Sequence, residues 1–215
     1  MTSRVAVVAA RPGPLATAVS SALEGAGAVV SVVPPPFADP ATAAEAVAGG
    51  PDVVVWADVD PDGLRPDPLV GLGELDWDRR CEEPLRSALF LLQAAYPHLR
   101  GRDGRVVLVC PSVALEGAAG LVPLATAAEG QRLLAKSAAR RWGQDGVTVN
   151  IVTVPVAALG ADLTAAADAA RTAAALPTAD ALEAAAGAVV WLVGEGAAGI
   201  TGATIGADGG AVMAP

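Results

Sequence analysis

Short apolar runs rich in valine alternate along this chain with longer segments in which apolar residues recur at helical spacing. The apolar runs occupy residues 4–10, 29–33, 52–57, 104–112, 147–154 and 202–208, and the helical segments occupy 11–28, 41–49, 76–101, 124–142 and 178–194. Strands that are apolar throughout are typical of a parallel sheet covered on both faces, and intervening helices supply right-handed crossovers. The pattern therefore predicts an α/β fold with a doubly wound, Rossmann-like parallel sheet of about six strands.

A single domain, residues 1–215, accounts for the whole sequence. The hydrophobic fraction of 53% is enough for one sizeable core, and the aromatic fraction of 3% requires that core to consist of small and branched aliphatic side chains. Three consecutive prolines at residues 34–36 follow the second strand. That stretch is too short to separate two domains and predicts a turn.

The net charge of −9 argues against a nucleic-acid or anionic-membrane partner, because both require a basic surface. No uncharged apolar run reaches 18 residues, and no basic leader precedes the first strand, so we expect a cytoplasmic protein with no membrane partner. The two cysteines, Cys81 and Cys110, form neither a disulfide framework nor a zinc spacing. No metal site is predicted.

Four segments in the back half carry a resemblance to a known family. They read LRSALFLLQAAYPHL, GRVVLVCPSVA, AKSAARRWGQDGVTVNIV and WLVGEGAAGITGATIGADGG. In this order and at these distances they resemble the short-chain dehydrogenase/reductase family, especially its ketoreductase-like members, over essentially the whole chain. The resemblance implies a dinucleotide-binding fold whose functional residues can be checked one at a time.

The family binds its dinucleotide on a glycine-rich turn after the first strand, and the three glycine places fall here on Ala10, Pro14 and Ala16. Glycines in that turn let backbone N–H groups approach the pyrophosphate, whereas proline has no N–H and alanine adds a methyl group. The chain also lacks the helix and strand that the family has after its second strand. The resemblance thus implies a degenerate member, shortened after Val33, that uses no nicotinamide cofactor.

After the third strand, the family has a turn that lines the adenosine side of the cofactor, and this chain has Trp56 and Asp58 there. Trp56 is expected to fill space that a nucleotide needs, and Asp58 to place negative charge near its phosphates. Like the lost glycines, both residues argue against binding of a nicotinamide dinucleotide.

The catalytic places of the family are also changed. Its asparagine, tyrosine and lysine fall on Pro84, Leu124 and Ala128, while Ser112 is a candidate relic of its serine. The only tyrosine, Tyr96, and the only lysine, Lys136, lie 40 residues apart, so no Tyr-x-x-x-Lys pair exists in the chain. Loss of such a general acid costs about 10²- to 10⁴-fold in rate.

Two other readings remain open at the level of sequence. The emptied pocket is a candidate site for a cofactor-independent cyclisation, dehydration or isomerisation that uses Ser112 or loop carboxylates, or for ligand binding and regulation. The carboxylates expected near the carboxyl ends of the strands are Asp58, Asp60, Glu116 and Glu129. The one histidine, His98, falls at a helix end, far from the strand that ends at Ser112, which argues against a catalytic triad.

The helices at 79–99 and 124–142 place apolar residues over a wider arc than one sheet-facing stripe requires. The residues concerned are Leu85, Leu92, Tyr96, Leu134 and Trp142. In the family resembled, these two helices meet a second subunit. The leading hypothesis is therefore an inactive subunit that forms a homo- or hetero-oligomer, associating with an active reductase of the same fold in a biosynthetic pathway.

Overall fold

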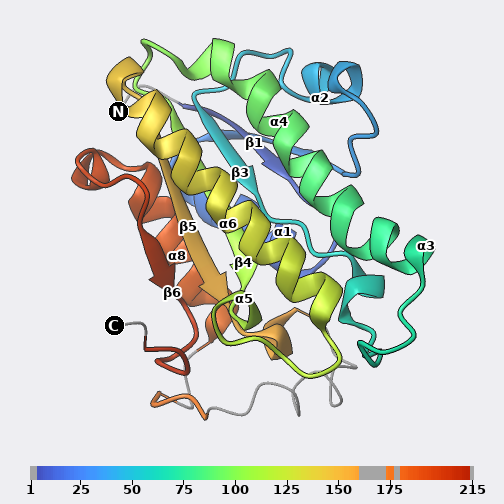
Figure 1. Cartoon of the computed structure of the whole chain (residues 1–215). Helices are drawn as coiled ribbons and strands as arrows, with labels where there is room; N and C mark the ends of the chain where they lie inside the picture. The colour runs from blue at the N-terminus through green and yellow to red at the C-terminus, as the bar shows by residue number, and fades with distance from the viewer. Residues whose placement is uncertain (1–3, 160–172, 177–179, 214–215) are drawn as a thin grey trace.

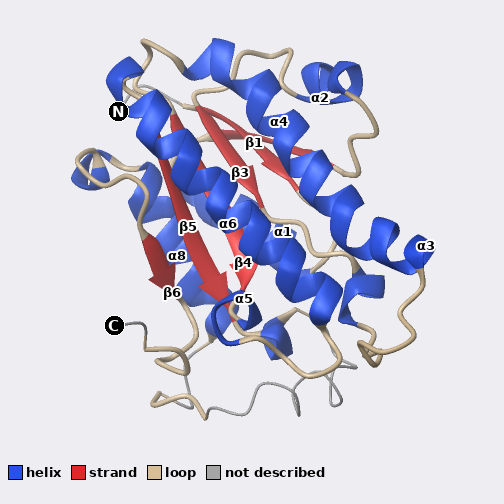
Figure 2. Ribbon diagram, in the orientation of Figure 1, coloured by secondary structure: helices blue, strands red, loops and turns tan. Residues whose placement is uncertain are grey.

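A computed structural model describes residues 4–159, 173–176 and 180–213. Its centre is one six-stranded parallel sheet with the strand order β2-β1-β3-β4-β5-β6 (Figure 2). The strands are β1 (Val5–Ala9), β2 (Val29–Val33), β3 (Val53–Trp56), β4 (Arg105–Pro111), β5 (Thr148–Val154) and β6 (Thr204–Gly206). The predicted doubly wound sheet of about six strands is confirmed.

Helices cover both faces of this sheet (Figure 1). On one face lie α1 (Pro14–Gly25) and α8 (Ala181–Val193), and on the other lie α2 (Pro40–Ala46), α4 (Glu83–Leu99) and α6 (Val122–Trp142). Two short helices, α3 (Glu74–Trp77) and α5 (Val113–Glu116), lie in the connections. In the part of the chain that the structure describes, no helix combines the length and the apolar character needed to cross a membrane.

The central strands are buried along their whole length, which is why their sequences are continuous runs of valine and leucine. β5 also contains three buried polar residues, Thr148, Asn150 and Thr153, of which Asn150 is fully buried and carries an amide. Its amide donates to the carbonyl of Ile200 at 2.8 Å and accepts from the amide of Ala203 at 3.1 Å. Asn150 thereby holds the turn that leads into β6 and satisfies both of its own polar groups.

A wider turn interrupts the helix that runs from α3 into α4. Residues Asp78–Glu82 form a π-helical turn directly before Pro84. Pro84 has no N–H to donate to the carbonyl of Arg80, four residues earlier. Its ring would also clash with that carbonyl in a regular α-helix, and the wider π turn provides the space it needs. The turn directs the Arg80 side chain inward, where it is fully buried.

The sheet ends at β2, as the shortened connection predicts. After Val33 the chain passes through its prolines to α2, and the amide of Phe37 donates to the Ser87 hydroxyl of α4 at 2.7 Å. This bond fixes the connection against the sheet-covering helix. Edge strand β2 is left with Val29 and Val32 exposed at 59% and 47% of their surfaces.

The helices α4 and α6 pack closely against each other. A Cβ atom on Gly130 would lie 3.0 Å from the Leu85 side chain, so glycine lets the two helices approach without displacing Leu85. Tyr96 stacks on Trp142 with ring centroids 4.9 Å apart, and its hydroxyl donates to Asp145 at 2.7 Å. Part of the apolar surface expected at a subunit contact therefore joins these two helices within one chain.

One residue of that expected surface is misplaced. Leu92 is only 4% exposed and belongs to the core between α4 and the sheet, so the expectation that it lies in an exposed patch is wrong. Leu85, Tyr96, Leu134 and Trp142 are half-buried. The most exposed apolar side chain on α6 is instead Leu133, at 59%.

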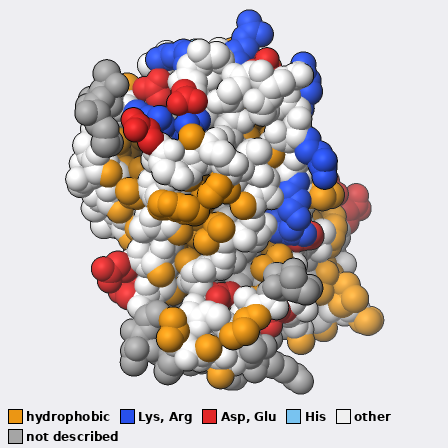
Figure 3. All heavy atoms as spheres, turned by 90° about the vertical axis from the view of Figure 1, so that its left-hand side faces the viewer, with side chains coloured by type: hydrophobic (Ala, Val, Ile, Leu, Met, Phe, Trp, Pro, Cys, Tyr) orange, Lys and Arg blue, Asp and Glu red, His pale blue; other side chains and the backbone are white. Residues whose placement is uncertain are grey.

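α6 also carries cations along one side. Arg132, Lys136 and Arg140 follow one another at intervals of four residues, which places them on one stripe of the helix. Figure 3 shows Lys and Arg side chains in a column on the side of the molecule where α6 lies. The chain has a net charge of −9, so this column is a locally positive region on an acidic protein.

We expect Leu92→Glu to lower the free energy of unfolding by more than about 3 kcal/mol, because it places a charge in the core without a partner. The matched control is Gln93→Glu, which introduces the same side chain at the next, exposed position and should change stability by less than about 0.5 kcal/mol. Urea unfolding followed by circular dichroism measures both. Equal stability of the two variants would contradict the placement of Leu92.

Candidate functional site

The natural ligand crevice of this fold lies where β1 and β3 are neighbours, because the direction of winding reverses there. The loops that follow these two strands meet over the carboxyl edge of the sheet. Arg11 follows β1, and Asp58 and Asp60 follow β3. These three residues decide what the crevice can hold.

Arg11 binds both carboxylates. Its backbone amide donates to Asp58 Oδ1 at 2.9 Å, and its guanidinium donates to Asp58 Oδ2 at 2.7 Å. The second guanidinium nitrogen, Nη2, lies 3.1 Å from Asp60 Oδ2. A network of this kind fixes the two loops against each other across the crevice.

The Asp58 carboxylate is almost completely buried, with 3% of its side chain exposed. Burial raises the pKa of Asp58, and the hydrogen bond from the Arg11 amide and the Arg11 charge act in the opposite direction. Arg11 therefore keeps the pKa of the buried Asp58 carboxyl from rising further. Asp58 is a structural partner of the β1–α1 turn.

The turn after β1 does not fit a dinucleotide pyrophosphate. The Ala10 amide donates to the Val33 carbonyl at 3.0 Å, the Arg11 amide is bound to Asp58, and Pro14 has no amide hydrogen at the start of α1. Ala10 is fully buried and Ala16 is 5% exposed, so their methyl groups belong to the core. Two amides of this turn are thus used within the protein, and a third is absent at Pro14.

Trp56 lies in a different place from the one expected. It is buried in the core on the α4 side of the sheet, edge-on to Phe37 with ring centroids 6.5 Å apart. The residue of this segment that lies in the crevice is Asp58.

The places of the family's catalytic residues are apolar and closed. Leu124 is 6% exposed and packs with Leu64, Val113, Leu121 and Val156 in a cluster that we call the apolar plug. Ala128 is 2% exposed and belongs to the main core. The apolar plug thus lies at the carboxyl edge of the sheet. Leu124 occupies the place that the family's tyrosine, with its hydroxyl group, has there.

Pro84 and Ser112 complete this set. The carbonyl of Pro84 accepts a hydrogen bond from the side-chain amide of Gln131 at 3.3 Å, and Gln131 is itself buried. Ser112 is 3% exposed at the end of β4, and its backbone amide donates to the Val154 carbonyl at 2.7 Å. Ser112 is therefore closed to a substrate, whereas Pro84 is half-buried and lines a small cavity.

A cavity of about 20 Å³ remains between the Arg11 network and the apolar plug. Its lining includes Asp58, Asp60, Arg80, Leu124 and Gln131. A space of this size holds about one water molecule, whereas small-molecule sites typically measure about 300–1,000 Å³. Among the described residues, the place of the expected pocket is therefore largely filled by the protein's own side chains.

Arg80 is not among the functional residues expected from the sequence, although its position in the helical pattern indicates that it is buried. Its guanidinium is fully buried and contacts the Asp67 carboxylate and the Arg65 carbonyl. Arg80 shares the helical phase of Ala88, Leu91 and Ala95, which face the sheet, so the periodicity already placed it inward. It ties the loop that follows β3 to the start of α4.

The remaining candidates do not assemble into a catalytic set. Glu129 is bound by Arg132 at 2.6 Å on α6, while Asp58 and Asp60 meet around Arg11. His98 lies in the last turn of α4, at the opposite end of the sheet from Ser112. Among the described residues, no group of three or more His, Cys, Asp or Glu side chains is placed to hold a metal ion.

Both cysteines are buried, free thiols. Burial raises the pKa of Cys81 to about 11 and that of Cys110 to about 12. Thiols with such pKa values stay protonated at neutral pH and are poor nucleophiles.

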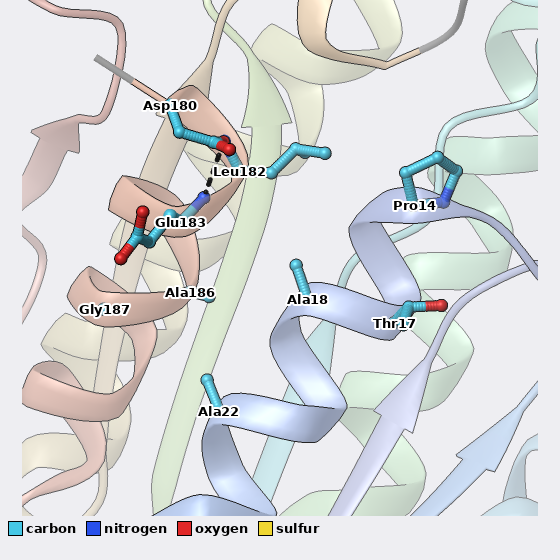
Figure 4. Close-up of a pocket in the computed structure, with 9 residues that line it drawn as sticks. All are labelled: Pro14, Thr17, Ala18, Ala22, Asp180, Leu182, Glu183, Ala186 and Gly187. Carbon is cyan, nitrogen blue, oxygen red and sulfur yellow. Dashed lines mark hydrogen bonds between the residues drawn. The ribbon is translucent and has the colours of Figure 1, made fainter.

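A hollow of about 740 Å³ lies between α1 and α8 on the other face of the sheet (Figure 4). Ala18 and Ala22 form its α1 wall, and Glu183 points away from α1. Asp180 accepts from the amides of Leu182 and Glu183 as the cap of α8, and the Thr17 hydroxyl donates to the Gly13 carbonyl. The polar groups of this groove are thus used locally, and it presents no converging set for catalysis.

A family model described as enoyl-(acyl carrier protein) reductase matches residues 41–212, well over half of the chain. The chain belongs to the short-chain dehydrogenase/reductase family. A segment of it is also similar to 12alpha-hydroxysteroid dehydrogenase from a Clostridium species, with 34% identity over 68 residues. That match spans 32% of this chain and 26% of the relative, so it covers about a quarter of the relative's length.

Solved structures share the fold over nearly the whole chain. A short-chain dehydrogenase/reductase from Serratia marcescens is 24% identical with a TM-score of 0.78, and the match covers 96% of each chain. One from Brucella melitensis is 19% identical with a TM-score of 0.81 and covers 98% of this chain and 97% of that one. A metagenomic blue fluorescent protein, solved with NADPH, is 21% identical with a TM-score of 0.79 and covers 98% and 99%.

We expect Arg11→Met to lower the free energy of unfolding by roughly 2 kcal/mol at pH 7, because it leaves the buried Asp58 carboxylate without its cation. Burial already raises the pKa of Asp58 above the ordinary 3.8, so protonation favours the folded state and stability falls as pH rises through the folded pKa. Removing Arg11 raises that pKa further. The loss should therefore be smaller at pH 4 than at pH 7 in denaturant unfolding.

The control is Arg102→Met, since Arg102 also binds a carboxylate, Asp52, at 2.9 Å but is 53% exposed. Its loss should cost less than about 1 kcal/mol at either pH. Adding Asp58→Asn to the Arg11→Met variant should remove the difference between the two pH values. A pH-independent loss in Arg11→Met would contradict the assignment.

Proposed function

We propose that this chain is a non-catalytic member of the short-chain dehydrogenase/reductase family that associates with an active reductase of the same fold, in a biosynthetic pathway. The observation that carries the proposal is the closed carboxyl edge. The Arg11 network and the apolar plug leave only about 20 Å³ where a cofactor and a substrate would have to meet.

The β1–α1 turn supports the part of the proposal that concerns the cofactor. The Arg11 amide is already bound and Pro14 has no amide hydrogen, and two carboxylates, Asp58 and Asp60, lie where phosphate groups would bring further negative charge. The match to the family model begins at residue 41, so this turn lies outside the matched region. We infer that the chain uses no nicotinamide cofactor.

The chemistry of the residues supports the part that concerns catalysis. Reduction of a carbonyl needs a proton donor beside the hydride donor, and Leu124 and Ala128 have no proton to give. Both side chains are buried in apolar clusters. We infer that the retained fold serves association.

Titration calorimetry with NADH and with NADPH should give no saturable heat at nucleotide concentrations up to about 1 mM, because Asp58 and Asp60 repel phosphate groups at a turn whose Arg11 amide is already bound. An active reductase of the same fold, measured in parallel, serves as the positive control. A dissociation constant in the micromolar range for either nucleotide would refute the proposal that the cofactor is lost.

The outer surface of α4 and α6 is the proposed contact with the partner subunit. Leu133 is 59% exposed there, and Leu85, Tyr96, Leu134 and Trp142 are half-buried beside it. Exposed apolar surface of this kind commonly marks an interface. The partner is either a second copy of the chain or an active relative.

Leu133→Glu should convert the complex to monomers while leaving the circular dichroism spectrum unchanged, because it charges the proposed contact without entering the core. Val29→Glu is the matched control, since Val29 has the same 59% exposure on edge strand β2. Sedimentation of the chain, alone and co-expressed with family reductases from the same genome, gives the mass of each assembly. A wild-type chain that is monomeric in every mixture would defeat the proposal.

A further inference from the structure

Two adjoining hollows lie between α6 and the edge strand β6, away from the closed crevice. The smaller, of about 400 Å³, is lined by Lys136, Ala139, Arg140, Thr201 and Gly202. The larger, of about 500 Å³, begins at the same Lys136 and Gly202 and extends to the segment after β6. Lys136 therefore stands at the junction of the two hollows.

The cations of this region differ in how they are paired. Arg132 is bound to Glu129 at 2.6 Å. Lys136 and Arg140 make no ion pair within residues 4–159, 173–176 and 180–213. Two cations one helical turn apart, without a carboxylate between them, create a local positive field on an acidic protein.

The other polar groups are hydroxyls that still have a proton to donate. Thr201 Oγ1 accepts from the Val149 amide at 3.1 Å, which leaves its own hydrogen for another partner. Thr153 and Thr204 line the larger hollow, and their buried hydroxyls have no partner among the described residues. Ammonium, guanidinium and hydroxyl groups are all hydrogen-bond donors, so together they suit a ligand rich in acceptor oxygens.

One acid lies in the larger hollow and none lines the smaller one. Asp208 is 4% exposed, and its two oxygens accept from the amides of Gly210 and Val212 at 2.9 and 3.2 Å. Its acceptor groups are therefore directed into its own loop. The smaller hollow, where Lys136, Arg140 and Thr201 meet, is the part that suits a negative charge.

We propose that the smaller hollow binds the oxyanion of a small molecule, a phosphate or a carboxylate, held by Lys136, Arg140 and the Thr201 hydroxyl. The larger hollow accommodates the rest of the molecule. This site uses none of the residues of the closed carboxyl edge, so it stands or falls independently of the proposed loss of catalysis.

Lys136 is the only lysine, which makes a direct test feasible. Reductive ¹³C-methylation labels Lys136 and the N-terminal amine and keeps their charge. Sodium phosphate and, separately, sodium acetate are titrated at constant ionic strength against sodium chloride. We expect the Lys136 methyl resonance to shift and saturate while the N-terminal resonance does not, and the anion that saturates at lower concentration identifies the oxyanion.

Arg140→Gln and Thr201→Val should each raise the apparent dissociation constant roughly three- to tenfold, as expected for loss of one charge-assisted bond. The control is Arg86→Gln on α4, which removes the same charge from a side chain paired with Asp78 and should change nothing. Circular dichroism confirms that the variants are folded. A shift that never saturates with either anion, or equal weakening by Arg86→Gln and Arg140→Gln, would overturn the proposal.

Discussion

The buried carboxylate of Asp58 must be paired, and its pairing with Arg11 organises the whole carboxyl edge of the sheet. A carboxylate with 3% of its surface exposed is stable only where charge and hydrogen bonds replace its water. Arg11 supplies an amide and a guanidinium, and its second nitrogen extends the network to Asp60. The two loops that frame the crevice in this fold are thereby joined by the protein itself.

The apolar plug closes the neighbouring region by a different force. Leu124, Leu121 and Val156 are removed from water together, and each such side chain contributes about 1.5–3 kcal/mol when fully buried. A site for a charged cofactor would need polar, partly hydrated walls there. The carboxyl edge of the sheet thus contributes to the stability of the fold, because apolar side chains fill the place where a ligand would enter.

Polar and charged groups are distributed unevenly over the molecule as a result. At the carboxyl edge, Arg11 pairs with the buried Asp58 and with Asp60, whereas on α6 Lys136 and Arg140 remain without an ion pair in the described structure. The hollow beside β6 owes its shape to Gly202, whose φ of +74° favours glycine and which faces Ala139. Small residues on both walls leave the space in which these cations stand.

The order of strands and helices could be predicted from the sequence, because continuous apolar runs and helical periodicity are local signals. The absence of a Tyr-x-x-x-Lys pair is likewise a property of the sequence alone, since one tyrosine and one lysine 40 residues apart cannot form it in any fold. The proline at residue 14 removes an amide from the turn whatever surrounds it. These conclusions need no knowledge of distant contacts.

Only the tertiary structure decided which polar residues meet and which apolar residues are exposed. Arg11 and Asp58 are 47 residues apart and come together because β1 and β3 are neighbours in the sheet. Leu92 is buried, although its helix has apolar residues on several sides, because the width of the stripe that α4 buries depends on how α2, α6 and the sheet surround it. Lys136 faces a hollow rather than a carboxylate for the same reason: side-chain partners are set by packing between elements, and local sequence contains no record of that packing.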